Sequence, residues 1–334
     1  MNFAAILLQW FKNNGRPLPW RETNDPYAIW LSEVILQQTR IAQGMSYWER
    51  FIAQWPTVND LAAATEDEVL KAWQGLGYYS RARNLHTAAQ QVVKIGEFPQ
   101  TFKGLKTLKG VGDYTAAAIA SIAFGQPVAV VDGNVYRVLS RYYGITTAID
   151  STEGKKEFQT LAQSLLPTNE PADYNEAIMD FGATQCTPTS PHCTTCPLCE
   201  TCVAFREQRM NELPVKSKKV KQRERHFTYL YIEYEGEIAI HQRGAGDIWQ
   251  GLWELPQAEQ LTSSKDSVWG KEALLLRKGV KHILTHQILL ADIYLWRPKV
   301  RPQLPSDFIW IKRQSLDNYA LPRLIEILLK EIPA

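Results

Sequence analysis

The spacing of apolar residues changes once along the chain, from a helical period to an alternating one. From residue 1 to about 205, apolar side chains recur every three to four positions, as in helices that bury one face. Beyond a basic stretch they alternate with polar residues, as in β-strands. The pattern predicts helices at 2–14, 26–38, 41–54, 65–74, 80–95, 114–124, 134–143, 152–166 and 175–185, then strands at 227–234, 238–242, 287–296 and 308–311, and a closing helix at 321–330.

Local start signals support several of these helices. Thr65 and Glu68 have the spacing of a capping box, and Pro26 follows Asp25 as the first residue of a helix would follow its cap. The change of period predicts a multidomain protein, with an all-α domain over residues 1–215 and an α+β domain over 227–334. The run of lysines and arginines at 216–226 predicts a basic linker that also touches a DNA backbone.

Composition narrows the class of protein only a little. The chain has 334 residues, 45% of them hydrophobic and 22% charged, as in ordinary globular proteins, and a net charge of +2. Contacts with nucleic acid must therefore come from local patches. No apolar run is as long as a membrane span, and the amino terminus lacks the basic leader of a signal peptide. We expect a cytoplasmic monomer without membrane contacts.

A glycine turn and an aspartate stand close together in the middle of the chain. Gly110 and Gly112 permit a tight turn, and the helix that follows directs its free N–H groups at an anion, for which phosphate is the best candidate. Asp132 ends an apolar segment just before another helix. The alternatives are a plain turn and a plain helix cap.

All five cysteines lie between residues 186 and 202, which favours a metal site over scattered disulfides. Cys186, Cys193, Cys196 and Cys202 are separated by six, two and five residues. This spacing suits either tetrahedral zinc or an iron–sulfur cubane and does not separate them. Cys199 fits neither pair regularly, so we interpret it as a bystander.

Several long motifs together carry a family resemblance. The motifs are residues 18–21 (Leu-Pro-Trp-Arg), 30–39, 75–81, the hairpin, residues 132–135 (Asp-Gly-Asn-Val) and the cysteine spacing. With them the chain resembles the helix-hairpin-helix DNA glycosylases of the endonuclease III type, and within these the A/G-specific adenine glycosylases of the MutY type. The resemblance implies one [4Fe-4S] cluster rather than zinc.

Two carboxylates fit the chemistry of base removal, which needs a proton on the leaving base and a negative charge beside the developing sugar cation. Glu33 shares the face of Ile29 and Leu36, so its pKa should be raised, as suits a general acid. Asp132 precedes a helix whose N–H groups favour the anion. The alternatives are a buried ion pair for Glu33 and a helix cap for Asp132. The resemblance assigns them the roles of proton donor and cation stabiliser.

The resemblance also implies further site residues. Tyr114 stands where bifunctional relatives have a Schiff-base lysine, which predicts little or no lyase activity, and Asn134 is expected to help position the sugar. A tyrosine that opens a helix is otherwise core packing. The predicted DNA contacts are Gln38 and Tyr78, which enter the base stack, the hairpin glycines Gly110 and Gly112, and Arg21, Arg81 and Arg83, which are otherwise solvated surface charges.

The second domain has a Nudix-like start at residues 251–256, Gly-Leu-Trp-Glu-Leu-Pro. A Nudix hydrolase needs a glutamate-rich helix for Mg²⁺, and residues 271–277 supply one carboxylate, so we predict a binding domain. The resemblance implies that Leu284, Thr285 and His286, with His282 nearby, read 8-oxoguanine. The family's loop is of the Phe-Ser-His type, and Leu284 departs from it. A strand-edge histidine without a ligand is the alternative.

Together these features predict a repair glycosylase that hydrolyses the N-glycosidic bond of adenine opposite 8-oxoguanine or guanine in duplex DNA and leaves an abasic site. One rival is a mismatch thymine glycosylase of the same fold, whose chains usually lack a second domain. The other is a non-catalytic DNA-binding protein in which Glu33 and Asp132 are structural.

Overall fold

The computed structural model describes residues 2–217, 222–261 and 269–333. Contacts divide the chain into two compact units. The helical unit comprises Met1–Ala62 and Thr87–Lys219, and the sheet unit comprises Ala63–His86 and Val220–Ala334. Within the described ranges, no helix has both the length and the apolar character needed to cross a bilayer.

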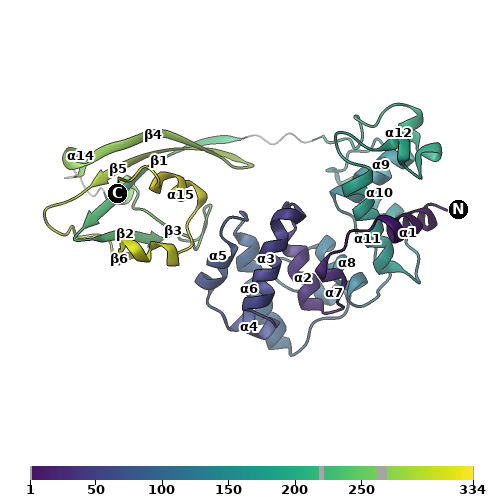
Figure 1. The fold of residues 1–334 in the computed structure, drawn as a ribbon, viewed down its shortest axis with the longest axis horizontal. Coiled ribbons are helices and arrows are strands. Elements are labelled where there is room, and N and C mark those ends of the chain that lie inside the picture. Colours follow the sequence, from purple (N-terminus) through teal and green to yellow (C-terminus); the bar gives the residue numbers. More distant parts are fainter. Residues whose placement is uncertain (1, 218–221, 262–268, 334) are drawn as a thin grey trace. The chain divides into compact units, whose positions relative to one another are not determined.

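The helical unit contains α-helices joined by short turns (Figure 1). Three of its short segments, η2, η3 and η4, lie in or beside the cysteine loop, and η2 is a π-helical turn. The elements are α1 (Phe3–Asn14), η1 (Pro19–Arg21), α2 (Pro26–Ile35), α3 (Ile41–Gln54), α4 (Val58–Ala63), α7 (Phe102–Leu105), α8 (Asp113–Ile122), α9 (Gly133–Tyr143), α10 (Thr152–Leu165), α11 (Pro171–Asp180), η2 (Phe181–Gln185), η3 (Cys193–Thr195), η4 (Cys199–Thr201) and α12 (Val203–Arg206).

Among the described residues of the helical unit, two apolar clusters pack its helices together. One joins α1, α9, α10 and α11 through fully buried side chains such as Leu7, Val135 and Phe158. The other packs α8 against the segment before α9, through Ala117, Ala118 and Val130. Every residue of α2 from Tyr27 to Ile35 is buried. Burial of this kind fixes side-chain positions, because close-packed interiors leave little room for displacement.

The sheet unit combines a mixed sheet with helical segments from two parts of the chain. The strand order is β3-β2-β1-β5-β4, and β6 pairs with β2. The elements are α5 (Glu66–Trp73), the first turns of α6 (Ser80–Ile95), β1 (Arg223–Tyr234), β2 (Glu237–Gln242), β3 (Trp253–Glu254), α13 (Ala258–Leu261), α14 (Trp269–Glu272), β4 (Leu274–Ile283), β5 (Gln287–Trp296), β6 (Phe308–Lys312), η5 (Arg313–Asn318) and α15 (Arg323–Leu329).

Strands β1 and β5 form the parallel centre of this sheet and are buried on both faces. On β1, Tyr229 and Tyr231 belong to one core cluster, which includes Leu324 and Leu328 of α15, while Leu230 and Ile232 belong to another. Parallel strands usually need cover on both faces, which explains their nearly continuous apolar sequence. The hairpin between β4 and β5 is therefore attached to a rigid central strand.

Most predicted elements exist, with a few corrections. The multidomain prediction of a helical part followed by an α+β part is confirmed, and α6 and β5 have the predicted bounds. The last four residues of the predicted linker, 223–226, are strand instead, since they pair with 287–290 of β5; residues 218–221 of that linker lie outside the described ranges. Residues 271–277, where a Nudix hydrolase would have its glutamate-rich helix, are divided between α14, which ends at Glu272, and β4, which begins at Leu274.

Candidate active site

Glu33 lies in the buried helix α2 and is 8% exposed. The helix starts at Pro26 because Asp25 caps it, accepting a hydrogen bond from the Tyr27 N–H. Tyr114 of α8 donates a 2.6 Å hydrogen bond to Oε2 of Glu33. Burial raises the pKa of Glu33 to about 7, although the Tyr114 hydrogen bond opposes this shift. The raised pKa agrees with the prediction and suits a group that holds a proton near neutral pH.

Asp132 caps α9 and is held by three hydrogen bonds. Its Oδ1 accepts from the backbone N–H groups of Asn134 (2.9 Å) and Val135 (2.8 Å), and its Oδ2 accepts from Nδ2 of Asn134 (2.7 Å). Burial nevertheless raises the pKa of Asp132 above its ordinary value, and these hydrogen bonds limit the rise. Asp132 therefore caps α9, and the same hydrogen bonds hold both of its carboxylate oxygens in fixed directions.

The two carboxylates and Tyr114 belong to one electrostatic site. Repulsion from Asp132 contributes to the raised pKa of Glu33. Burial, followed by repulsion from Glu33 and Asp132, raises the pKa of Tyr114 well above its ordinary value. The Tyr114 hydrogen bond thus brings together residues of α8 and α2, and charge repulsion couples both of them to Asp132 at the start of α9.

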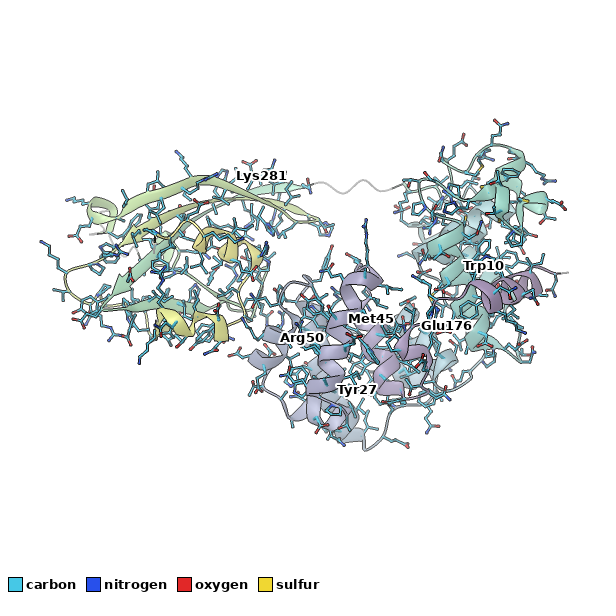
Figure 2. All side chains as sticks on the ribbon, in the orientation of Figure 1. Trp10, Tyr27, Met45, Arg50, Glu176 and Lys281 are labelled. Atoms are coloured by element: carbon cyan, nitrogen blue, oxygen red, sulfur yellow. The ribbon has the colours of Figure 1, made fainter. Side chains whose placement is uncertain are left out.

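Sequence reasoning missed a second acidic pair, Glu176 and Asp180, on α11; Glu176 is labelled in Figure 2. Arg21 forms a 3.1 Å ion pair with Glu176 and pairs with Asp180 at 2.9 Å. Repulsion from Glu176 also raises the pKa of Glu33. Arg21 is thus held inside the protein beside the site, with a side chain only 13% exposed, so it is not a solvated surface charge. The sequence signal for this pair is its i, i+4 spacing, which places both carboxylates on one face of a helix.

Arg137 was also missed, and it connects the cap of α9 to the cysteine loop. Its NH2 group donates to Oδ1 of Asn134 (2.8 Å) and to the carbonyl of Gly182 (2.6 Å), while Nε donates to the carbonyl of Cys186 (2.7 Å). A Cβ on Gly182 would lie 2.6 Å from Cβ of Asn134, so only glycine fits there. Arg137 therefore fixes the direction in which the Asn134 amide donates to Asp132.

The glycine turn lies directly before α8, the helix that carries Tyr114. Gly110 has φ +77°, a left-handed conformation that favours glycine, and Gly112 is the N-cap of α8. A Cβ on Gly112 would meet no atom within 4 Å, so its backbone is open to approach. The turn and Tyr114 are thus parts of one rigid element, with the first N–H groups of α8 directed into the turn.

The four cysteines at cluster spacing line one cavity, together with Cys199 and Arg141. Arg141 anchors the loop: its NH1 lies 3.4 Å from Sγ of Cys186 and 2.8 Å from the carbonyl of Thr187. No disulfide joins any two of the five cysteines. Among the described residues, no three His, Cys, Asp or Glu side chains are grouped as a single metal ion requires. A cubane spreads its ligands over four irons, so its thiolates need not approach one another so closely.

Gln38 and Tyr78 share an unusual backbone conformation. Gln38, just after α2, has φ +58° and is exposed; Tyr78, before α6, has φ +46° and is 46% exposed. Left-handed conformations are uncommon for residues other than glycine and concentrate at functional sites. The Tyr78 ring is therefore accessible, as a DNA contact requires, whereas the neighbouring Tyr79 is buried.

Arg81 and Arg83 extend from the first turn of α6 and are engaged within the sheet unit. Arg81 lies over the rings of Trp73 and Tyr78, and burial lowers its pKa to about 10. Arg83 donates to the carbonyl of Gln250 at 2.5 Å. Neither arginine is therefore a freely solvated charge.

The predicted lesion-reading residues Leu284, Thr285 and His286 form the turn between β4 and β5. The turn is closed by the Leu284 N–H, which donates to the Gln287 carbonyl at 2.8 Å. The hydroxyls of Thr285 and Tyr78 lie 2.5 Å apart, so two residues predicted to contact DNA meet within the sheet unit. Leu284 packs on the main core cluster of this unit, so the core holds the turn in place.

Comparison with protein families assigns the two parts of the chain. Residues 31–167 match the HhH-GPD superfamily of base excision DNA repair proteins, and residues 228–331 match the NUDIX domain. The solved structure of a thermostable thymine-DNA glycosylase is 31% identical, with a TM-score of 0.57; the match covers 61% of this chain and 95% of that one. Fold and site thus define a base excision DNA repair glycosylase of the helix-hairpin-helix class.

Comparison with individual relatives narrows the class. The adenine DNA glycosylase of Buchnera aphidicola subsp. Acyrthosiphon pisum is 30% identical, over 98% of this chain and 97% of the relative. The human adenine DNA glycosylase is 44% identical, over 63% of this chain and 41% of the human protein. The chain belongs to the adenine DNA glycosylases.

Proposed function

We propose that this enzyme removes adenine paired with 8-oxoguanine or guanine in duplex DNA, with Glu33 as the general acid and Asp132 as the stabiliser of the sugar cation. The observation that carries the proposal is the hydrogen-bonded contact of Tyr114 with a buried Glu33 whose pKa is about 7. An acid with this pKa is protonated in a large fraction of molecules at neutral pH and readily transfers its proton.

Cleavage of the N-glycosidic bond separates the base from a sugar that becomes positively charged. A proton from Glu33 neutralises the electron pair that moves onto adenine as the bond breaks. Asp132 carries the opposing charge next to the sugar, and its hydrogen bonds with Asn134 and Val135 hold both oxygens in place. Such preorganised charge stabilises a cationic transition state without reorganisation. Water then completes the hydrolysis and leaves an abasic site.

Tyr114 and Asn134 are proposed as positioning groups. Tyr114 orients the carboxyl group of Glu33, and Asn134 orients that of Asp132. Bifunctional relatives have a lysine where Tyr114 lies, and a phenol cannot form a Schiff base. We therefore propose an enzyme with little or no lyase activity.

DNA is proposed to be held through backbone contacts and through residues that enter the base stack. The N-terminus of α8 at Gly110 and Gly112 supplies N–H groups for a phosphate. The exposed, left-handed Gln38 and Tyr78 are suited to fill the space that a flipped adenine leaves. Arg21, Arg81 and Arg83 add positive charge, although each is already engaged within the protein.

We propose that Cys186, Cys193, Cys196 and Cys202 hold one [4Fe-4S] cluster. The observation that supports the fit is their shared cavity, in which the guanidinium of Arg141 lies beside Cys186. A positive group suits the net negative charge of thiolates around a cluster. Arg137 would connect a loop that holds the cluster to Asn134, because it donates both to the Cys186 carbonyl and to Oδ1 of Asn134.

The sheet unit is proposed to read 8-oxoguanine through Thr285 and His286 and to have no hydrolase activity of its own. The carboxylate of Glu272, which a Nudix hydrolase would use for Mg²⁺, accepts a hydrogen bond from Trp296 at 3.1 Å. Thr285 presents a hydroxyl next to that of Tyr78. Replacement of Thr285 and His286 together by alanine should lower the preference for 8-oxoguanine:A over G:A; an unchanged ratio would count against this role.

A single-turnover assay with alkali cleavage of abasic sites tests the proposal. Duplexes with 8-oxoguanine:A, G:A, 8-oxoguanine:C and G:T should give base release from the first two only, with few strand breaks before alkali. Release from G:T would favour the thymine glycosylase instead. No release from any duplex by iron-loaded enzyme would contradict the proposal.

A further inference from the structure

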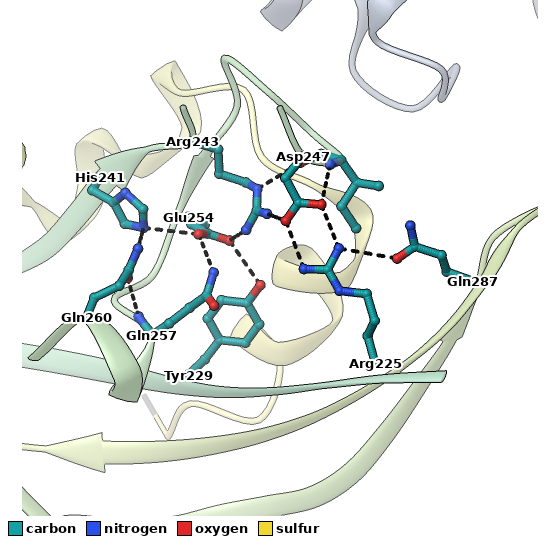
Figure 3. A network of polar contacts seen from close by, with 10 residues as sticks. Arg225, Tyr229, His241, Arg243, Asp247, Glu254, Gln257, Gln260 and Gln287 are labelled. Carbon is teal, nitrogen blue, oxygen red and sulfur yellow. Dashed lines mark hydrogen bonds and ion pairs between the residues drawn. The ribbon is translucent and has the colours of Figure 1, made fainter. Parts of the chain in front are cut away.

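The loop between β2 and β3, residues 243–252, carries an aspartate held by two arginines (Figure 3). Oδ1 and Oδ2 of Asp247 accept from NH1 (2.6 Å) and NH2 (2.8 Å) of Arg225. Oδ2 also accepts from NH2 of Arg243 at 2.8 Å. The two parallel contacts with Arg225 fix direction as well as distance, as bidentate arginine–carboxylate pairs do.

Arg225 connects this loop to the turn at 284–286. It lies on β1 next to the start of β5, and its NH1 group lies 3.3 Å from Oε1 of Gln287, the first residue after the turn (Figure 3). Two residues earlier on β1, the Arg223 N–H donates to the carbonyl of His286 at 3.1 Å. The outer end of β1 thus contacts His286, the last residue of the turn, and Gln287, the first residue after it.

A second contact runs from the same loop to the other strand of the hairpin. Trp249 has φ +61°, and its ring lies 6.2 Å from that of His282 on β4. Trp249, Ile248 and Leu284 all pack on one core cluster. A left-handed tryptophan costs conformational energy, and such strain persists where the surroundings require a particular placement.

The loop is itself anchored in the interior of the sheet unit. NH1 of Arg243 donates to Oε2 of Glu254 at 2.6 Å, and the Tyr229 hydroxyl donates to the same oxygen at 3.0 Å (Figure 3). The Glu254 side chain is 1% exposed, and His241 lies 3.0 Å from its other oxygen. Asp247 therefore joins a rigid buried network to the partly exposed Arg225.

We propose that the Arg225–Asp247 pair positions the 284–286 turn and thereby sets the preference for 8-oxoguanine over guanine opposite adenine. This inference rests on the proposed lesion-reading role of Thr285 and His286. The pair is partly exposed, with side chains 25% and 38% accessible, so water can replace part of what either side chain loses on substitution. Recognition by hydrogen bonds, in contrast, requires donors held within about 0.5 Å of the productive geometry. Asp247 and Arg225 are thus positioning residues.

The test substitution is Asp247→Asn, which keeps the shape and removes the charge. Arg243 keeps its contact with Glu254 in this variant, so the core network stays paired. The matched control is Glu237→Gln, which removes the acid of a comparably exposed pair with Arg301 (2.9 Å) at the other end of the sheet. Single-turnover rates on 8-oxoguanine:A and on G:A duplexes give the preference, and melting temperature reports folding.

Asp247→Asn should lower the ratio of the two rates by about tenfold, the effect of one misplaced hydrogen bond, through slower cleavage of 8-oxoguanine:A. The G:A rate and the melting temperature should stay close to those of the parent, and Glu237→Gln should leave the ratio unchanged. Arg225→Lys, which keeps the charge but loses the bidentate contact, should lower the ratio in the same direction.

A double substitution in Asp247 and the turn distinguishes a positioning role of Asp247 from a general structural one. If Asp247 acts through Thr285, adding Asp247→Asn to Thr285→Ala should lower the ratio no further. Three results would overturn the inference. Asp247→Asn could leave the rate ratio at the parental value, Glu237→Gln could lower the ratio as much as Asp247→Asn does, or the effects of Asp247→Asn and Thr285→Ala on the ratio could be fully additive. A parent enzyme that does not prefer 8-oxoguanine:A at all would instead overturn the proposed lesion reading.

Discussion

Tyr114 donates a 2.6 Å hydrogen bond to Glu33 across 81 positions of sequence, and this contact joins α8 to the buried helix α2. The bond favours the ionised form of the carboxyl group, while burial favours the protonated form. The balance of the two keeps the pKa of Glu33 near 7, and the contact therefore controls the pH at which the acid loses its proton.

Tyr114→Phe should move the alkaline limb of the pH–rate profile to higher pH. Loss of the hydrogen bond removes a contribution that lowers the pKa of Glu33, so the pKa rises, by about one pH unit. The matched control is Tyr27→Phe, which loses a buried hydroxyl bonded to the Trp55 carbonyl and should leave the limb in place. Identical profiles for Tyr114→Phe and the parent would refute the assigned role.

Asp132→Asn should abolish base release while DNA binding persists. Asparagine caps helices about as well as aspartate, so α9 should form normally, whereas the negative charge beside the sugar is lost. We expect a fall in single-turnover rate of at least about 100-fold. Asp25→Asn, the same change at the cap of α2, should cost far less activity. Turnover by Asp132→Asn within tenfold of the parent would exclude the proposed charge stabilisation.

Arg137→Gln should weaken both catalysis and cluster retention. The substitution removes the donors to Asn134, Gly182 and Cys186 and leaves their buried acceptors unsatisfied. We expect an activity loss of about tenfold or more, together with faster loss of iron to a chelator. Arg209→Gln, at a partly exposed arginine of the same unit, is the control. An Arg137→Gln enzyme with parental iron retention would disprove the link.

The cysteine assignment predicts a difference between neighbours. Cys196→Ser should lose most of its iron and the visible absorbance of the cluster, because a ligand is removed. Cys199→Ser should keep both, although Cys199 lines the same cavity. Iron content and absorbance of the two purified variants decide the matter. Equal iron loss in both would make Cys199 a ligand and the proposed set incorrect.

The fold was most predictable where a single physical signal was strong. The bounds of α6 follow from its helical period, and the capping box at Thr65 and Glu68 is present as predicted. Strand β4 was missed because two register shifts and Gly279 interrupt its alternation. Helices α4 and α7 are too short, at six and four residues, for a period to be visible.

The candidate catalytic carboxylates were predictable from the sequence, but the residues that hold them in place were not. Glu33 and Asp132 stand in recognisable local patterns, a carboxylate on an apolar face and a carboxylate before a helix. The pairing of Arg21 with Asp180 spans 159 positions, and no local pattern reveals such a contact. Helix α2 also ends at Ile35 rather than at the predicted residue 38, because Gln38 adopts a left-handed conformation that a helix excludes.

The pH dependence of single-turnover adenine release from an 8-oxoguanine:A duplex tests the central claim most directly. With the pKa of Glu33 at about 7, the rate should fall about tenfold between pH 6 and pH 8 as the acid deprotonates. Glu33→Gln should be almost inactive across this range, with DNA binding intact. A parent rate that is flat or rises over the same interval, or a Glu33→Gln enzyme within tenfold of the parent, would contradict the account.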